Sequence, residues 1–134
     1  MESKSLTLTL PWPPSVNRYW RRHGHTIHRS AEATQYIRLV QAQLRTQFRF
    51  SSLACPLVVL VEALPPDKRL RDLDNLLKAL LDACTKAELW RDDSLIHDLR
   101  IVKRSVIRGG KILLHVRPLA PVLKGLKYEM QVRA

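Results

Sequence analysis

The sequence predicts a small single domain of the α+β class, in which a mixed β-sheet is packed by two helices. Four short segments have the apolar patterns of strands, and two longer segments repeat apolar residues every three or four positions, as helices do. With 134 residues, 46% of them hydrophobic, the chain is long enough to build one core. No run of about 18 apolar residues predicts a membrane span, so we expect no membrane partner.

The first half of the chain is expected to hold one strand and one helix. Leu alternates with Thr over residues 6–10, which is typical of a half-buried strand. Residues 15–29 are rich in Arg, His and aromatic side chains and are expected to form a loop. Ser30 is placed to cap a helix that runs to about Phe50, with Glu32 near its positive end.

The second half is expected to hold three strands and one helix. Residues 57–64 are apolar and rich in Val, which indicates a buried strand. An apolar stripe over residues 72–87 predicts the second helix. Strands are expected at about residues 99–107 and 111–117, and the glycine pair at 109–110 predicts a hairpin between them.

The ends of the chain and its cysteines bear on the extent of the domain and on its compartment. From residue 118 the pattern weakens, so we expect a domain over residues 1–117 and a tail over residues 118–134, which is either a disordered end or an added strand. Cys55 and Cys84 lie in apolar segments without the spacing of a disulfide framework or a zinc site. With no signal-peptide run at the start, these features favour a cytoplasmic protein with reduced cysteines.

Charge is distributed unevenly along the chain. The formal net charge is +11, but residues 67–98 hold eight of the 12 acidic residues and six of the 23 basic residues. That window therefore carries −2 and the rest of the chain +13. A basic surface favours phosphate, and clustered carboxylates favour a hard cation such as Mg²⁺. The combination predicts metal-assisted chemistry on a nucleic-acid backbone, and the simpler alternative is a solvated basic surface.

Three aspartates are the candidate metal ligands. Asp72 and Asp74 are expected at the start of the second helix, where side chains two residues apart point about 200° from each other. They converge on one ion only if the backbone between them is not fully helical. Asp93 follows this helix, which is expected to be about 22 Å long. To join the same site as Asp72 and Asp74, it must return along the helix or come from another chain. In the alternative interpretation, Asp72 caps the helix, Asp74 favours its dipole and Asp93 lies in a solvated turn.

Basic and aromatic side chains flank these carboxylates in the sequence. Lys78 either pairs with Asp74 or Asp82 on the helix, or places its ammonium beside a metal-bound phosphate. Tyr19 or Trp20 either stacks on an unpaired base or packs on the core. We expect phosphate contacts from six basic residues. They are Arg18, Arg21, Arg22, Lys68, Arg69 and Arg71.

Three stretches, read in order, make the sequence resemble the RusA family of Holliday junction resolvases. They are PWPPSVNRYW at residues 11–20, RDLDNLLKA at 71–79 and WRDDS at 90–94. The resemblance covers about residues 5–117. It implies a RusA-like domain and a small α/β homodimer, often carried by prophages, that cuts four-way DNA junctions using Mg²⁺ or Mn²⁺.

The resemblance also assigns roles to particular residues. The family's three metal-binding aspartates fall on Asp72, Asp74 and Asp93, and its catalytic-site lysine falls on Lys78. The family usually has glycine where this chain has Glu88. The implied function is that of a structure-selective endodeoxyribonuclease in DNA recombination and repair, without a small-molecule cofactor. The residues alone leave two alternatives open: a non-catalytic basic DNA-binding protein, and a nuclease that acts on flaps or forks.

Overall fold

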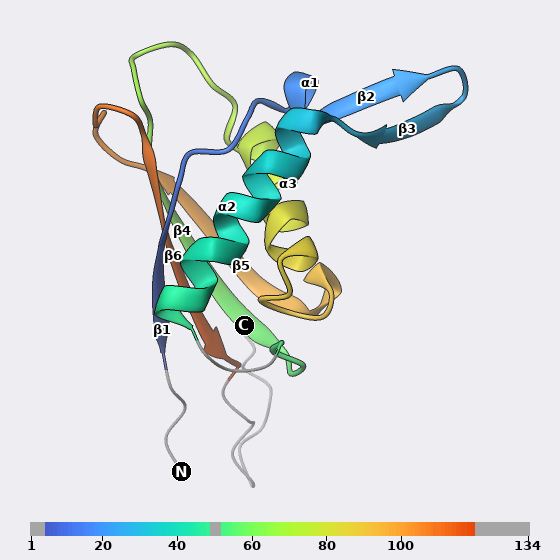
Figure 1. Ribbon diagram of the computed structural model, residues 1–134. Coiled ribbons are helices and arrows are strands. Elements are labelled where there is room, and N and C mark those ends of the chain that lie inside the picture. The colour runs from blue at the N-terminus through green and yellow to red at the C-terminus, as the bar shows by residue number, and fades with distance from the viewer. Residues whose placement is uncertain (1–4, 49–51, 120–134) are drawn as a thin grey trace, which may run out of the picture.

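The computed structural model describes residues 5–48 and 52–119. Its main feature is a four-stranded sheet with strand order β1-β6-β4-β5, and two helices cover one face of this sheet (Figure 1). The expected α+β class, with a mixed sheet packed by two helices, is confirmed. The elements are β1 (Leu6–Leu10), α2 (Ala31–Gln47), β4 (Leu57–Leu64), α3 (Leu73–Lys86), β5 (Ile96–Lys103) and β6 (Lys111–Pro118). Over the described residues, no helix combines the length and the apolar character that a bilayer span needs.

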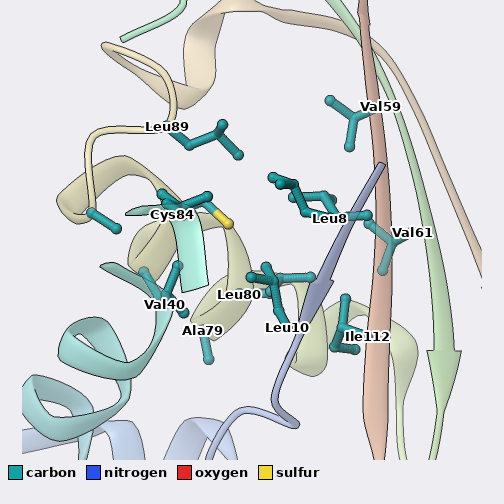
Figure 2. Packing of buried hydrophobic residues seen from close by; sticks show 14 of the residues in the cluster. Leu8, Leu10, Val40, Val59, Val61, Ala79, Leu80, Cys84, Leu89 and Ile112 are labelled. Carbon is teal, nitrogen blue, oxygen red and sulfur yellow. The ribbon is translucent and has the colours of Figure 1, made fainter. Parts of the chain in front are cut away.

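The core lies between the sheet and the two helices. Every second residue of β4 is buried, beginning with Leu57, while the residues between them are only half-buried. Figure 2 shows Leu80 and Cys84 of α3 on one side of this core and Leu8 and Val61 of the sheet on the other. Cys84 is a free thiol, and burial raises its pKa to about 12. The apolar layer holds α3 at a fixed place on the sheet, since each buried Leu or Val contributes about 1.5–3 kcal/mol.

Strand β4 lies between β5 and β6, so the hairpin expected from residues 99–107 and 111–117 is wrong. β5 pairs with β4 in parallel, and β6 pairs with the other edge of β4 in the antiparallel sense. The reason is that β4, α3 and β5 form a crossover unit, which places β5 directly beside β4. The glycines do form a tight turn, with φ of +84° at Gly109 and +73° at Gly110. A Cβ at Gly110 would lie 2.9 Å from the Cβ of Trp12, so this close approach requires glycine.

The helices begin and end close to the expected positions. The hydroxyl of Ser30 accepts from the N–H of Ala33 at 3.0 Å, which confirms the cap, and Glu32 lies in the first turn. Helix α2 ends at Gln47, three residues before the expected end. Helix α3 begins and ends within one residue of the expected range. Strand β5 begins at Ile96, three residues before the expected start.

The end of the described chain still belongs to the sheet. Strand β6 continues to Pro118, one residue beyond the expected strand, where it pairs with Leu57. The N–H of Leu119 then donates to the carbonyl of Pro56 at 2.9 Å. The rest of the expected tail, residues 120–134, lies outside the described residues.

Residues 15–29, expected as a loop, form a short helix and a hairpin that projects from the protein (Figure 1). They hold α1 (Val16–Tyr19), β2 (Trp20–His23) and β3 (Thr26–Arg29). Gly24, at φ +62°, supplies the left-handed conformation in the turn. Because Arg21 to His28 are exposed on both faces, the strands have no apolar alternation, and the pattern could not predict them. We call residues 20–29 the basic hairpin.

Helix α3 ends in a Schellman motif that has glutamate where glycine is favoured. The N–H of Leu89 donates to the carbonyl of Cys84, and that of Glu88 to the carbonyl of Thr85, both at 3.0 Å. Glu88 occupies the left-handed position of the motif, with φ of +69°. A side chain at such a φ costs about 1–2 kcal/mol, a cost that glycine avoids.

We expect Glu88→Gly to raise the free energy of unfolding by about 1 kcal/mol, because relief of backbone strain exceeds the entropy that glycine adds to the unfolded chain. Urea and thermal unfolding of the full chain measure this change. Ala42→Gly, at an exposed position inside α2, is the control and should lower stability by about 1 kcal/mol. A similar loss in both variants would contradict the strain at Glu88.

Candidate metal centre and nucleic-acid interface

Helix α3 carries Asp72 and Asp74 at its N-terminal end. Asp72 is the N-cap residue, with an extended backbone at φ −86° and ψ 131°, and Asp74 lies in the first turn. Because Asp72 is not helical, the 200° separation of helical neighbours does not apply to this pair. The Asp72 side chain makes no cap hydrogen bond, so the alternative in which it caps the helix is wrong. Both side chains are exposed, and neither forms an ion pair with another described residue.

The loop before α3 is held in place by Asp67. Its carboxylate accepts from Nη1 of Arg71 at 2.8 Å and from the backbone N–H of Arg69 at 3.0 Å. These bonds, with that of Arg71 first, hold the pKa of Asp67 below its usual value. The Arg71 guanidinium lies 5.6 Å from the ring centroid of Trp12, and the Arg71 carbonyl accepts from Nζ of Lys103 at 3.2 Å. The chain is therefore fixed by several contacts just before the first carboxylate.

Two cavities open beside the start of α3, and they share residues of α1. The first, of about 620 Å³, lies between α1 and the loop before α3, and Asp72 and Asn75 line it. The second, of about 460 Å³, lies between α1 and the basic hairpin, and Lys78 lines it. Val16 and Asn17 line both cavities. Asp72 and Lys78 therefore border adjoining cavities.

Asn17 and Asn75 are residues of this region to which the sequence patterns did not point. Both line the first cavity, where each amide offers a donor and an acceptor to a ligand. A single asparagine has no diagnostic spacing, so only the fold reveals its place at a cavity.

Lys78 is exposed and forms no ion pair within the part of the chain that the structure describes. One of its expected helix partners, Asp82, instead accepts two hydrogen bonds from Arg29, at 2.7 Å each. The alternative in which Lys78 pairs with Asp74 or Asp82 is therefore wrong. Its ammonium is available to an anion in the second cavity.

Asp93 lies at the opposite end of α3 from Asp72. Helix α3 has 14 residues and is about 21 Å long, and η1 (Asp93–Leu95) follows its C-terminal end. Ile96 then pairs with Leu57, the first residue of β4, whereas the chain reaches Asp72 from the last residue of β4. Burial is the largest cause that raises the pKa of Asp93, and the negative charges of Asp92 and Asp82 raise it further. Within residues 5–48 and 52–119, no three His, Cys, Asp or Glu side chains are grouped to hold a metal ion.

The six basic residues expected at phosphate fall into two groups. Arg18 pairs with Glu32 at 3.0 Å, and Arg69 pairs loosely with Asp67 at 3.7 Å, although both arginine side chains are largely exposed. Arg71 is 23% exposed and holds the loop before α3. The other three are exposed and have no ion pair with any residue in the described ranges. They are Arg21, Arg22 and Lys68.

Tyr19 and Trp20 pack within the protein. Tyr19 is fully buried, so the interpretation in which it stacks on a base is wrong. Trp20 is half-buried against the core, and its ring meets that of Tyr19 edge-on, with the centroids 5.1 Å apart. The guanidinium of Arg29 lies over the Trp20 ring. Packing on the core, the alternative stated for these aromatic side chains, is thus confirmed for Tyr19.

The fold and this site together define a class of protein. The chain is a small basic α+β domain that presents, near the start of one helix, two carboxylates and a lysine without an ion pair among the described residues. Arginines line the two cavities beside that helix. Carboxylate oxygens suit a hard cation, and unpaired cationic side chains suit phosphate. The class is that of a basic protein with a candidate cation and phosphate site.

Known proteins similar to this chain identify its family. A family model described as endodeoxyribonuclease RusA matches residues 11–117, and the chain belongs to this family. A crossover junction endodeoxyribonuclease RusA from Escherichia coli O139:H28 (strain E24377A / ETEC) is 44% identical over 113 residues, which are 84% of this chain and 94% of that protein. The proteins of the same name from Escherichia coli K12 and Enterobacteria phage 82 are also 44% identical. They align over 82% and 81% of this chain, and over 92% and 91% of their own lengths, respectively. The resemblance stated from the sequence motifs is confirmed.

Proposed function

We propose that this chain is a structure-selective endodeoxyribonuclease that resolves four-way DNA junctions in recombination and repair, by metal-dependent hydrolysis of paired phosphodiester bonds. The printed names of its relatives, crossover junction endodeoxyribonucleases, support the substrate class. One observation carries the proposal: Asp72 stands at an N-cap position but makes no cap hydrogen bond. A carboxylate that does not cap is available as a ligand. Free cysteines support a place in the cytoplasm, where thiols stay reduced.

Asp72 and Asp74 would hold Mg²⁺, or Mn²⁺, through the oxygen ligands that these cations prefer. A bound cation supplies an activated water and neutralises charge on the phosphate. The donor chemistry of the two side chains fits this role, because both are exposed carboxylates without an ion pair among the described residues. The ligand set of one chain is nevertheless incomplete, since Asp93 lies beyond the far end of α3.

A second copy of the chain would supply the missing carboxylate. A twofold axis perpendicular to α3, near its middle, sets two α3 helices antiparallel. Asp93 of one copy then approaches Asp72 and Asp74 of the other. The same axis creates two equivalent sites, as two symmetric incisions require. A homodimer therefore accounts both for the separation of the aspartates in one chain and for paired cutting.

Lys78 and the basic side chains act on the phosphate in this proposal. The Lys78 ammonium stabilises negative charge that develops on the phosphoryl oxygens, or protonates the leaving oxygen. Contacts to backbone phosphates fall to Arg21, Arg22 and Lys68, whose charges are unpaired within the described residues. Arg18, Arg69 and Arg71 line the first cavity, so they meet the strand nearest the aspartates while also holding their own protein partners.

Mixing two inactive variants tests the shared site. Asp72→Asn and Asp93→Asn are each expected to be inactive alone, because each removes a ligand from both sites of its dimer. In a mixed dimer, one site carries both substitutions and the other carries neither. Random exchange of subunits makes about half of the dimers mixed, so about a quarter of all sites are intact. We expect the mixture to regain cutting of a labelled four-way junction in Mg²⁺, as single rather than paired nicks.

The controls separate this proposal from its alternatives. Each variant is measured alone, and wild type is measured with EDTA, with linear duplex and with a forked duplex. No recovery after verified subunit exchange would contradict a site shared between two copies. Equal cutting of fork and junction by wild type would favour the less selective nuclease. Tight junction binding without nicks would favour the non-catalytic DNA-binding protein.

A further inference from the structure

The basic hairpin projects from the protein and is exposed along most of its length (Figure 1). It contains three Arg, three His and no acidic residue. Every residue from Arg21 to His28 is exposed, including Ile27 at 58%. A two-stranded hairpin is only marginally stable in water by itself. Its orientation on the protein therefore depends on what holds its base.

One carboxylate of α3 holds both sides of that base. Tyr19, directly before β2, donates its hydroxyl to Oδ2 of Asp82 at 2.5 Å. Arg29, the last residue of β3, donates Nε to Oδ2 and Nη2 to Oδ1 of the same carboxylate, both at 2.7 Å. The guanidinium also lies 5.2 Å from the ring centroid of Trp20, the first residue of β2. Asp82 therefore binds the last residue of β3 directly, and it also binds the residue that immediately precedes β2.

This contact is charged and only partly open to water. The side chains of Arg29 and Asp82 are 31% and 19% exposed. Burial acts to raise the pKa of Asp82, but the bonds from Arg29 and Tyr19 outweigh it and hold that pKa below its usual value. Burial and the bond to Asp82 raise the pKa of Tyr19. The carboxylate is therefore ionised at neutral pH, and bidentate charged bonds of this kind are stronger than neutral ones.

Asp82 connects the basic hairpin to the helix that carries the candidate site. It follows Lys78 by four residues, which is about one helical turn. Lys78 lines the same cavity as Arg21 and Arg22 of the hairpin. The charge of Asp82 is matched by Arg29, so it adds little repulsion toward DNA. Its position and its partners favour a structural link between the hairpin and the site over a role as a metal ligand.

We propose that Asp82 is a positioning residue of the proposed nuclease, which fixes the basic hairpin on α3 so that Arg21 and Arg22 meet junction DNA at a set distance from Asp72. The inference rests on the proposed function and deepens it. Asp82 touches neither phosphate nor the reacting atoms. A linear duplex is held by general charge attraction, whereas a branched substrate must meet the hairpin and the site at the same time. The residue should therefore affect selectivity for junctions more than the rate of cutting.

Asp82→Asn is the test variant, because it removes the charge while keeping the size of the side chain. Amide hydrogen exchange should become about tenfold faster in residues 20–29 and stay unchanged in the sheet. Junction affinity, measured in EDTA to prevent cutting, should fall about tenfold while linear duplex affinity falls less than twofold. In Mg²⁺, the protein concentration that gives half-maximal cutting should rise by the same factor, with a smaller change in the maximal rate.

Glu62→Gln is a matched control on the other face of the sheet. The carboxylate of Glu62 accepts from Nε of Arg104 at 2.9 Å and contacts Nε2 of His115 at 2.6 Å, so it also has one arginine and one further partner. Its loss should lower thermal stability to a similar degree as Asp82→Asn. It should not change exchange in the basic hairpin or the ratio of junction to duplex affinity.

The outcomes separate this inference from the proposed function. Faster exchange confined to the hairpin, with a selective loss of junction affinity, supports positioning by Asp82. Unchanged hairpin exchange in Asp82→Asn would overturn the inference even if wild type resolves junctions. Faster hairpin exchange with an unchanged ratio of junction affinity to duplex affinity would overturn the claim that this positioning affects DNA selectivity. Failure of wild type to cut or prefer junctions would instead sink the proposed function, while the exchange result would still decide whether Asp82 holds the hairpin.

Discussion

Asp72→Asn is expected to reduce cutting of a four-way junction at least about 100-fold while leaving junction binding intact. The neutral amide is a weaker ligand for a hard cation than the carboxylate, because it contributes no negative charge to the site. The side chain makes no cap hydrogen bond, so its replacement should cost little helix stability. Binding should be equal or tighter, because one carboxylate near the phosphate backbone is removed. Cutting is measured in Mg²⁺ with a labelled junction, and binding is measured in EDTA.

Asp98→Asn is the control for a general effect of removing one negative charge. Asp98 is exposed on β5, and the proposed site gives it no role. This variant should cut at the wild-type rate and unfold at the wild-type temperature. If the Asp72→Asn variant cut at the wild-type rate, Asp72 would not be a ligand of the metal ion. A large fall in its melting temperature would show that the loss of cutting reports folding instead.

Trp90→Ala is expected to lower the free energy of unfolding by about 3–5 kcal/mol, the largest stability effect that we predict. Trp90 is fully buried in the core, and its Nε1–H donates to the hydroxyl of Thr85 at 2.8 Å. Its neighbours form backbone bonds with Leu53, from the N–H of Leu53 to the carbonyl of Leu89 and from the N–H of Arg91 to the carbonyl of Leu53. These contacts join the end of α3 to the segment before β4. Since native domains are stable by about 5–15 kcal/mol, the loss is a large fraction of the total.

Urea unfolding at fixed pH measures this loss, and two further variants give its scale. Trp90→Phe keeps most of the buried volume and should cost less than half as much. The hydroxyl of Thr85 keeps its bond to the carbonyl of Leu81, so it would not be left unsatisfied. Leu39→Ala, at an exposed position of α2, should change stability by less than about 0.5 kcal/mol. A cost below about 1 kcal/mol for Trp90→Ala would contradict its place in the core.

The elements with an apolar sequence pattern could be predicted from the sequence, whereas the short helix α1 and the basic hairpin could not be. The Val-rich apolar run of β4 and the helical stripes of α2 and α3 predicted their types and nearly all of their ends. The basic hairpin was predicted as a loop because its strands bury neither face. The glycines at 109–110 indicated a tight turn correctly, but a turn signal does not state which strands pair beyond it.

The sequence by itself determined the family, the types of the main elements and the presence of Asp72, Asp74 and Lys78 on one helix. The family follows from motifs spread along the chain, whereas the element types and the place of these three residues follow from spacing along a single element, which local geometry converts into a direction in space. Only the tertiary structure decided that Asp93 does not return along α3 toward Asp72, and that Asp82 is bound by Arg29 of the basic hairpin. The periodicity of apolar residues predicts which face of an element is buried. Which distant segment meets that face depends on the order of the strands and on the packing of the whole chain.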